Sequence, residues 1–350
     1  MNTDALVSIV IPTFNAEKFI RRCLEAALAQ TYGNTEIIVI DDGSTDSTLD
    51  MCRIYAGRDK RIKLFHHANK GVSATRNMGM ELAKGDYIAF FDADDYPEKD
   101  LVASYIRAYE EFGQEKIAFV MCGMFFDNTL NRNIDDKESI LGASEGYVEG
   151  RNYILSRNYA ATLSWLKLFN FVTNKCYDLN RIKEGNIRFD ETIHIGEDLK
   201  FNLDYLDMYK GGFGMVDKAL YHYVKHSNNS LSITYHDNDL TDTKDIYSRF
   251  LDWEASQEGV TEDNILVIKS MYITDWVSRM TTMYEKSKED SSAGAVRKIL
   301  KRELQSEEFK EMLSEVYKAR KISTIRFLSL YVGRFEVFFF LRGIYQIYKG

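Results

Sequence analysis

Three aspartates crowd into four positions directly after an apolar segment of the chain. Residues 86–91 read DYIAFF, and Asp92, Asp94 and Asp95 follow at once. Carboxylates gathered within a few ångströms raise each other's pKa unless a cation lies between them. Mg²⁺ and Mn²⁺ prefer oxygen ligands, usually take one or two carboxylates, and complete their shell with water and substrate phosphates. The spacing therefore indicates a divalent metal that holds a diphosphate.

Two further polar clusters end apolar segments earlier in the sequence. Residues 12–15 read PTFN, and residues 41–46 read DDGSTD. In an open parallel sheet, ligands bind at the carboxyl ends of the strands, so we expect the three clusters to meet in one crevice. A simpler interpretation of residues 92–100 is a strand end followed by a helix cap. The second acidic cluster favours the metal site over that alternative.

The first 125 residues alternate β-rich segments with helical patterns, which is typical of an α/β fold with a mostly parallel sheet covered by helices. We expect strands over 6–12, 35–41, 61–67, 86–92 and 117–126. Residues 16–30 have helical periodicity, with Asn15 as the predicted N-cap. Its expected apolar face consists of Phe19, Ile20, Cys23, Leu24, Ala27 and Leu28.

The remainder of the chain is less regular at first and then helical. Residues 127–150 are typical of an exposed loop. Residues 153–232 are mixed and rich in aromatic side chains, among them Trp165, for which stacking on a sugar and packing in a core both remain open. Residues 240–322 carry helix-period apolar positions, which predict a helical region.

Composition excludes several classes of protein. The 350 residues carry a formal net charge of −8, whereas nucleic-acid binders present basic surfaces, so we expect no nucleic-acid partner. The four cysteines match no zinc or redox spacing, which indicates buried free thiols in a reducing cytoplasm. No segment reaches the ~18 uncharged apolar residues of a membrane span, and the N-terminus lacks the basic region of a signal peptide.

Four segments in order resemble the family 2 glycosyltransferases, which adopt the GT-A fold. They are residues 7–32 (VSIVIPTFNAEKFIRRCLEAALAQTY), 36–48 (EIIVIDDGSTDST), 69–95 (NKGVSATRNMGMELAKGDYIAFFDADD) and 196–202 (GEDLKFN). The resemblance is dense from Val7 to Leu101, sparser from Asn174 to Ser232, and absent from the last hundred or so residues. It implies a nucleotide-sugar donor and a saccharide acceptor.

The resemblance also implies roles for individual residues on the donor side. Pro12, Thr13 and Glu17 match the nucleoside pocket, and Asp41 matches the partner of a uracil ring. The remaining implied donor contacts are Asp42 and Ser44 beside the base, Arg76 and Asn77 near the diphosphate and ribose, Asp92 and Ala93 in the Asp-x-Asp motif, and Asn174 and Lys175 near the donor sugar. Ala93 stands where many relatives have Ser.

Metal and proton chemistry are assigned in the same way. Asp92 and Asp94 match the metal-binding motif, and His226 matches a third ligand in some relatives, although a structural role for this histidine stays open. The expected cofactor is Mn²⁺ or Mg²⁺. Inverting transfer needs a carboxylate that takes the proton of the acceptor hydroxyl. The resemblance points to Asp198 as this base, with Glu197 in support. The alternative is that both only lie at a helix N-terminus, where negative charge is favourable.

The C-terminal segment 322–350 interleaves basic residues with Phe, Tyr and Leu. This pattern suits a helix lying on an anionic membrane surface. A helix docked on the core or on a second subunit is the alternative, and the helical region is a candidate homodimer interface. A location at the inner face of the plasma membrane would suit a lipid-linked acceptor in capsule, exopolysaccharide or O-antigen assembly.

The sequence predicts an inverting, metal-dependent glycosyltransferase that uses a nucleotide-sugar, with UDP as the favoured nucleotide. We expect a GT-A domain over 1–235, with a nucleotide-sugar-binding half (1–125) and an acceptor and base half (126–235), followed by a helical region over 236–350. One alternative is a degenerate GT-A domain that binds without transferring. The other is a phosphohydrolase, whose Asp-x-Asp normally follows the first strand and not the fourth.

Overall fold

The computed structural model describes residues 4–128, 151–225, 238–287 and 293–331. It divides into two compact units, residues 1–230 and 231–350, which are described separately. His226 and most of the segment 322–350 lie outside the described residues, as does most of the loop expected over 127–150.

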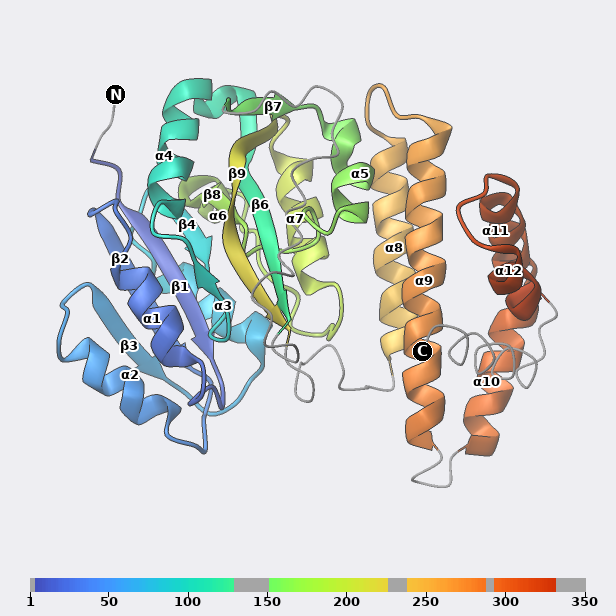
Figure 1. Cartoon of the computed structure of the whole chain (residues 1–350), viewed down its shortest axis with the longest axis horizontal. Helices are drawn as coiled ribbons and strands as arrows, with labels where there is room; N and C mark the ends of the chain where they lie inside the picture. Colours follow the sequence, from blue (N-terminus) through green and yellow to red (C-terminus); the bar gives the residue numbers. More distant parts are fainter. Residues whose placement is uncertain (1–3, 129–150, 226–237, 288–292, 332–350) are drawn as a thin grey trace. The chain divides into compact units, whose positions relative to one another are not determined.

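Four parallel strands form the first half of the sheet in unit 1 (Figure 1). They are β1 (Val7–Thr13), β2 (Thr35–Asp41), β3 (Ile62–His66) and β4 (Tyr87–Phe90), in the order β3-β2-β1-β4. All residues of β1, β2 and β4 are buried, as expected for strands covered on both faces. Thr13 pairs with Asp41 in the register of β1 and β2, so both strand ends finish at the same edge.

The strand order reverses between β1 and β4, and this reversal creates the crevice. Because parallel crossovers are right-handed, α1 (Ile20–Leu28) and α2 (Thr48–Ala56) lie on one face of the sheet, and α3 (Val72–Leu82) lies on the other. The carboxyl ends of β1 and β4 therefore diverge into loops that go to opposite faces. Such a switch point is where open α/β sheets bind ligands.

The predicted N-cap of α1 is wrong. The helix begins at Ile20 and has no side-chain cap, whereas Asn15 adopts a left-handed backbone conformation with φ of 47°. Its Oδ1 accepts a hydrogen bond from Thr45 N at 2.8 Å, and its own N–H donates to Ser44 Oγ at 2.9 Å. Asn15 therefore joins two strand-end loops instead of starting a helix.

Five further strands extend the sheet to nine, all within the described residues. They are β5 (Tyr96–Pro97), β6 (Ile117–Asn128), β7 (Tyr153–Leu155), β8 (Lys175–Asp178) and β9 (Gly212–Lys225), giving the order β3-β2-β1-β4-β8-β6-β9-β5 with β7 paired to β9. From the pairings, six strands run in one direction, and β5, β7 and β8 run in the other. The predicted α/β class with a mostly parallel sheet is confirmed.

Aromatic rings fill the core between this second half of the sheet and its helices, α4 (Leu101–Phe112), α5 (Ala160–Trp165), α6 (Leu179–Glu184) and α7 (Glu197–Met208). Phe189 and Phe201 stack at 4.2 Å, and Phe119 stacks on Phe213 at 5.2 Å. The four cysteines are free and buried, as predicted. Trp165 is 56% exposed at the end of α5, which excludes the core interpretation for this residue.

Unit 2 consists of helices in the residues described: α8 (Asp239–Ala255), α9 (Glu262–Ser287), α10 (Ala293–Gln305), α11 (Glu307–Lys318) and α12 (Thr324–Tyr331). Trp276 of α9 packs against Phe309 of α11 at 4.8 Å, and the Ser306 hydroxyl caps α11. The helical C-terminal region is thus confirmed. Within the described ranges, no helix is both long and apolar enough to cross a bilayer.

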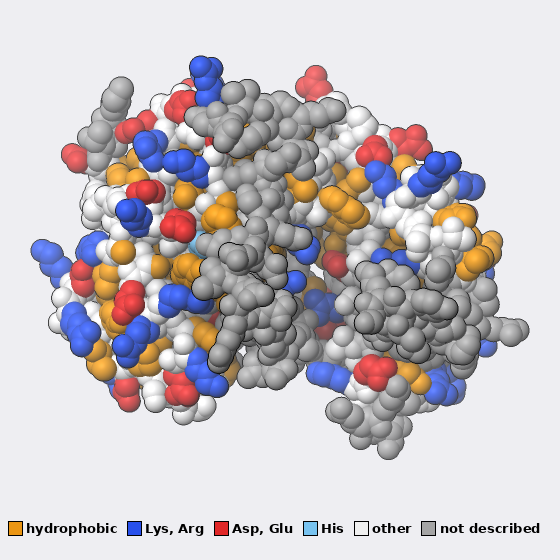
Figure 2. All heavy atoms as spheres, in the orientation of Figure 1, with side chains coloured by type: hydrophobic (Ala, Val, Ile, Leu, Met, Phe, Trp, Pro, Cys, Tyr) orange, Lys and Arg blue, Asp and Glu red, His pale blue; other side chains and the backbone are white. Residues whose placement is uncertain are grey.

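Basic and acidic side chains alternate over the face of unit 1 that carries α1 and α2, without a patch of one sign (Figure 2). An example is the pair of Asp50 and Arg53 on α2, whose side chains are largely exposed and lie 2.8 Å apart. Exposed pairs of this kind contribute little to stability. The unbalanced charge of unit 1 lies instead at its strand ends.

Candidate active site

One arginine joins the two acidic segments that the sequence placed in the crevice. Arg76, on α3, is 3% exposed, and its guanidinium donates to Asp92 Oδ1 at 2.9 Å and to Asp198 Oδ1 at 2.7 Å. Glu197 Oε1 lies 3.7 Å from the same guanidinium. Asp92 and Asp198 are far apart in the sequence, so this contact brings the Asp-x-Asp segment and the predicted base together.

Strand β9 holds the acidic turn that follows β4. The backbone N–H of Asp92 donates to the Tyr221 hydroxyl at 3.0 Å, and Val224 N donates to Asp95 Oδ1 at 2.8 Å. From the other side, Arg22 of α1 donates to the carbonyl of Asp94 at 2.7 Å. The turn is therefore anchored through its backbone and through Asp95. Asp92 Oδ1 is at the same time paired with Arg76.

The carboxylates of this turn carry more negative charge than their surroundings neutralise. Burial, together with the Asp92 carboxylate, raises the pKa of Asp94 to about 6. Burial and the carboxylates of Asp92 and Asp94 raise the pKa of Asp95 well above its usual range. Among the described residues, Asp95 Oδ2 is buried without a hydrogen-bond partner. A bound cation would relieve this repulsion. The donor set, carboxylate oxygens alone, fits Mg²⁺ or Mn²⁺.

No group of three or more His, Cys, Asp or Glu side chains that could hold a metal is preformed among the described residues. Asp92 and Asp94 can therefore provide two ligands at most from this part of the chain. Two carboxylates match the usual coordination of Mg²⁺, which is bound by one or two carboxylates together with substrate phosphates and water.

The predicted base lies in the first turn of α7. Gly196 precedes the helix with φ of 80°, a conformation that favours glycine, and Glu197 and Asp198 follow it. Asp198 Oδ2 accepts a hydrogen bond from Val172 N at 3.1 Å. Burial raises the pKa of Asp198 while Arg76 opposes the shift, and burial with the Asp198 charge raises the pKa of Glu197 to about 7. Both carboxylates are thus more basic than an ordinary Asp or Glu side chain.

Asn174 and Lys175 hold the loop that precedes β8 through hydrogen bonds of their side chains. Both side chains are fully buried. Lys175 Nζ donates to the carbonyls of Leu168 and Phe171 and to Asn174 Oδ1, and Asn174 Nδ2 donates to Leu168 O at 3.1 Å. Burial lowers the pKa of Lys175 to about 7, while these oxygen acceptors stabilise its charged form. These bonds position the loop that ends at Val172, and the contact of both residues with the donor stays a prediction.

Asn77 has a similar role. It is 2% exposed, its Nδ2 donates to Phe189 O and Glu191 Oε1, and its Oδ1 accepts from Phe189 N at 2.8 Å. These bonds engage both ends of the amide, and the predicted contact with the diphosphate or ribose stays a prediction. Asn77 attaches α3 to the segment that leads into α7.

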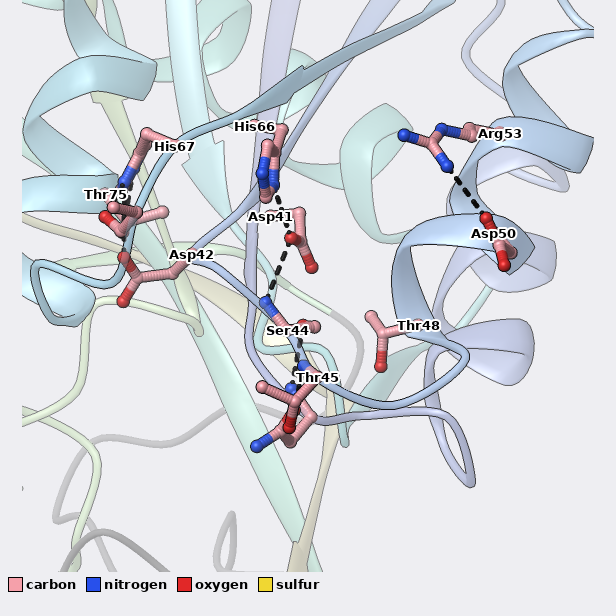
Figure 3. A network of polar contacts seen from close by, with 12 residues as sticks. Asp41, Asp42, Ser44, Thr45, Thr48, Asp50, Arg53, His66, His67 and Thr75 are labelled. Carbon is pink, nitrogen blue, oxygen red and sulfur yellow. Dashed lines mark hydrogen bonds and ion pairs between the residues drawn. The ribbon is translucent and has the colours of Figure 1, made fainter.

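Backbone N–H groups and histidines order the acidic cluster after β2 (Figure 3). Asp41 Oδ2 accepts from Ser44 N at 3.1 Å and lies 2.8 Å from His66 Nδ1. Asp42 accepts from the N–H groups of Lys70 and Gly71 at 2.7 and 2.9 Å, and His67 Nδ1 lies 3.3 Å away. Asp42 therefore shapes the loop before α3, while Asp41 keeps one oxygen unused.

Two buried polar atoms at the ends of β1 and β2, Thr13 Oγ1 and Asp41 Oδ1, have no hydrogen-bond partner among the described residues. Thr13 and Asp41 are paired in the sheet register. Leaving a buried polar group unpaired costs free energy, so such atoms in a crevice are candidates for ligand contact. The pair fits a nucleobase, whose edge offers both a donor and acceptors.

The remaining predicted donor residues border this pair. Pro12 is buried beside Thr13, and Ala93 is buried within the Asp-x-Asp segment. Glu17 Oε2 accepts from Ser47 N at 3.1 Å, which braces the loop after β2. Phe14 was missed by the sequence analysis. Its side chain is 46% exposed between Thr13 and Asn15. The sequence pattern that indicates it is an aromatic residue within a polar strand end.

The profile of the family described as "Glycosyl transferase family 2" matches residues 8–169. The uncharacterized glycosyltransferase EpsJ of Bacillus subtilis is 32% identical over 234 residues, which cover 66% of this chain and 64% of EpsJ. Chondroitin synthase of Escherichia coli is 33% identical over 227 residues, covering 64% of this chain and 30% of that protein. The matches thus span less than two thirds of either relative.

Among solved structures, residues 1–349 of S. aureus TarS in complex with UDP-GlcNAc align with a TM-score of 0.63. The alignment covers 98% of this chain and 91% of that one at 19% sequence identity. At this identity the likeness concerns the fold, and it extends over both units of the chain.

Proposed function

This chain belongs to glycosyl transferase family 2, and from that premise we propose that it is an inverting, metal-dependent glycosyltransferase. It would move one sugar from a UDP-sugar to a saccharide acceptor. The nucleotide choice is supported by the fold shared with TarS, whose structure holds UDP-GlcNAc. The saccharide acceptor is supported by the relationship to a chondroitin synthase.

The observation that carries the proposal is the bridge made by Arg76. One guanidinium contacts Asp92 of the Asp-x-Asp segment and Asp198 of the predicted base. A single-displacement transfer needs a leaving diphosphate and a proton acceptor on opposite sides of one sugar. Because Arg76 contacts both Asp92 and Asp198, the proposed diphosphate site and the proposed base are separated by only one guanidinium. A planar guanidinium also binds phosphate oxygens well, so Arg76 can turn part of its charge toward the donor.

At the donor end, Asp41 and Thr13 would bind the base of the nucleotide. The unpaired Asp41 Oδ1 is a pure acceptor, which suits the N3–H of uracil, and Thr13 Oγ1 can both donate and accept. Phe14 offers an exposed ring beside them, on which a base can stack. A nucleoside bound here points its diphosphate along the switch point toward Asp92.

Asp92 and Asp94 would hold the Mn²⁺ or Mg²⁺, and His226, outside the described residues, stays a proposed third ligand. When bound, the cation neutralises the charge that develops on the leaving nucleoside diphosphate. The chain itself contributes the fixed geometry of the turn, because Tyr221 and Val224 hold Asp92 and Asp95 to β9. Asp94 follows Asp92 by two residues in the same turn and would supply the second carboxylate.

Asp198 would accept the proton of the attacking acceptor hydroxyl. Val172 N–H and Arg76 fix its two oxygens, and each oxygen keeps a lone pair for the incoming proton. Glu197 stands beside it in the same helical turn and can bind the acceptor. The product would be a saccharide lengthened by one sugar with inverted configuration at the transferred carbon.

A lipid-linked acceptor at the inner face of the plasma membrane, in the synthesis of a cell-surface polysaccharide, remains part of the proposal. It is supported by the basic and aromatic composition of segment 322–350 and by the relationship to polysaccharide synthases. Pairing of two copies through the helical unit is the alternative use of that segment.

Calorimetric titration with UDP, and then with GDP, tests the proposal. Each titration is done with Mn²⁺ and repeated with EDTA. We expect UDP to bind more tightly than GDP and to depend on Mn²⁺. Asp94→Ala should remove the metal dependence. Asp50→Ala, which replaces an exposed aspartate on α2, is the matched control and should bind as the wild type does. If neither nucleotide binds under any condition, the proposed function is wrong.

A further inference from the structure

Three partly exposed aromatic side chains cluster near the carboxyl ends of β6 and β9. This aromatic wall consists of Phe126, Phe171 and Tyr223. The ring of Tyr223 lies 5.7 Å from that of Phe126, its partner in the strand register, and 5.4 Å from that of Phe171. Neither the proposed metal ligands nor the proposed base account for this surface.

The wall lies between the two halves of the active site. Side chains two residues apart on a strand point to the same face, so Tyr223 projects alongside Tyr221, whose hydroxyl accepts from Asp92 N. The next residue, Val224, bonds to Asp95. On its other side the wall ends at Phe171, directly before Val172, whose N–H donates to Asp198.

The hydroxyl of Tyr223 makes no hydrogen bond to any described residue, unlike the hydroxyls of its neighbours. Tyr221 accepts from Asp92, Tyr177 donates to Asn202, and Tyr205 donates to a backbone carbonyl. Burial and the carboxylates of Asp95, Asp92, Asp94 and Asp198 raise the pKa of Tyr223 to about 12, in keeping with a position between both acidic groups. The phenol therefore stays protonated and able to donate.

We propose that Tyr223 contacts the transferred sugar of the donor, with the aromatic wall as the surface on which the sugar ring rests. This rests on the proposed function, in which the sugar must lie between the diphosphate at Asp92 and the base Asp198. A pyranose presents an apolar C–H face, which packs on aromatic rings, and hydroxyls, which bond to a polar tip such as the phenol. Tyr223 would thus help to determine which sugar is transferred.

Donor hydrolysis and nucleotide binding test this role with three probes, UDP, UDP-glucose and UDP-N-acetylglucosamine, in the presence of Mn²⁺. For the UDP-sugar that the wild type hydrolyses faster, we expect Tyr223→Ala to lower kcat/KM about tenfold or more, because a contact made only by the sugar is lost. Affinity for UDP should stay within about twofold of the wild type. Tyr223→Phe, which keeps the ring, should alter the ratio of the two rates.

Tyr209→Ala is the matched control, because Tyr209 is half-buried at the far end of α7 and donates to Arg181 O. It should leave both readouts unchanged. If Tyr223→Ala hydrolyses both sugars as the wild type does, or loses UDP affinity in parallel with rate, the inference is overturned. Tyr223→Phe, which preserves packing, decides the case if the alanine variant unfolds: unchanged rates and an unchanged ratio overturn the inference. A wild type that binds no UDP overturns the proposed function as well.

Discussion

The two ends of the active-site crevice handle their carboxylates in opposite ways. At the nucleotide end, backbone N–H groups and histidines surround Asp41 and Asp42. At the catalytic end, Asp94, Glu197 and Asp198 are buried among other carboxylates, and each has a raised pKa. Arg76 balances part of that charge.

The difference shows which end is complete without a ligand. Hydrogen bonds to a carboxylate stabilise its charged form, so the nucleotide end is organised in advance. Repulsion among buried carboxylates disfavours the charged form, so the catalytic end reaches its working state only when charge is supplied from outside. A nucleotide would therefore bind to a prepared surface, and the metal and diphosphate would complete the other half.

The largest effect should come from removing the base at the catalytic end. Asp198→Asn keeps the hydrogen-bond acceptor for Val172 N but cannot take a proton, so we expect kcat to fall by about 10²–10⁴-fold. Affinity for UDP should stay near that of the wild type, because the nucleotide end is untouched. Release of UDP from a UDP-sugar measures kcat, and calorimetry measures the affinity for UDP. A wild type that binds UDP but has no turnover to lose would identify a binding protein.

Removing Arg76 should destabilise the catalytic end itself. Arg76→Ala leaves the partly buried carboxylates of Asp92 and Asp198 without their cation, which we expect to cost about 1.5–3 kcal/mol in the free energy of unfolding. Urea unfolding followed by circular dichroism measures this change. The control, Arg53→Ala, removes an exposed partner of Asp50 and should change stability by less than about 0.5 kcal/mol. Equal effects of the two variants would contradict the bridging role.

At the nucleotide end, Asp41→Asn should change base selectivity with little loss of stability. The amide oxygen can still accept from Ser44 N and His66, so the new NH₂ group takes the place of the unpaired oxygen. That group opposes the N3–H of uracil, and we expect UDP affinity to fall by about 1–3 kcal/mol, or roughly fivefold to 150-fold. CDP, whose N3 is an acceptor, should lose less. An unchanged UDP-to-CDP ratio in competition titrations would show that Asp41 does not contact the base.

The smallest effect is a pH dependence of stability from Glu197. Its pKa in the folded protein is raised from 4.5 to about 7 by burial and by Asp198, so folding favours the protonated form. The stability it contributes is fully present below about pH 4.5 and is lost as the pH rises through 7. Glu197→Gln should therefore flatten the decline in Tm between pH 5 and 8. A decline as steep as in the wild type would contradict this prediction.

Glu254 is a matched control for that measurement because it lies in the helical unit. Burial raises its pKa to about 7, and its Oε2 is buried without a partner. Glu254→Gln should also flatten the pH dependence of stability, with the same sign. Unlike Glu197→Gln, it should leave UDP release unchanged, which separates a stability effect from a catalytic one.

The predicted elements were most accurate where local pattern and tertiary environment agree. The structure contains the predicted strands over 35–41 and 117–126 and the helical region after residue 240. A continuous apolar segment suits a strand that is buried on both faces, and apolar positions at helical spacing suit a helix that is buried on one face. The strands β5, β7, β8 and β9 were not predicted. The first three have four residues or fewer and are held by pairing with distant strands, and β9 lies in the region that the sequence indicated only as mixed.

The candidate site shows the same division. Sequence alone selected Asp92, Asp94, Asp41 and Asp198 from their positions after strands or before a helix. It also selected Asn77, Asn174 and Lys175 for the donor; in the structure all three donate to backbone carbonyls, and their donor contacts stay predictions. No sequence pattern distinguishes a polar side chain that faces a ligand from one that satisfies a buried loop.

By itself, the sequence determined the α/β class, the acidic strand ends and the membership of a transferase family, because these depend on periodicity and on residue types at short spacing. Only the tertiary structure decided that Arg76 joins Asp92 to Asp198, that Val172 supplies a backbone N–H to the base, and that Tyr223 stands between the two acidic groups. These contacts link residues many positions apart, and their geometry is set by how β4, β9 and α7 pack together.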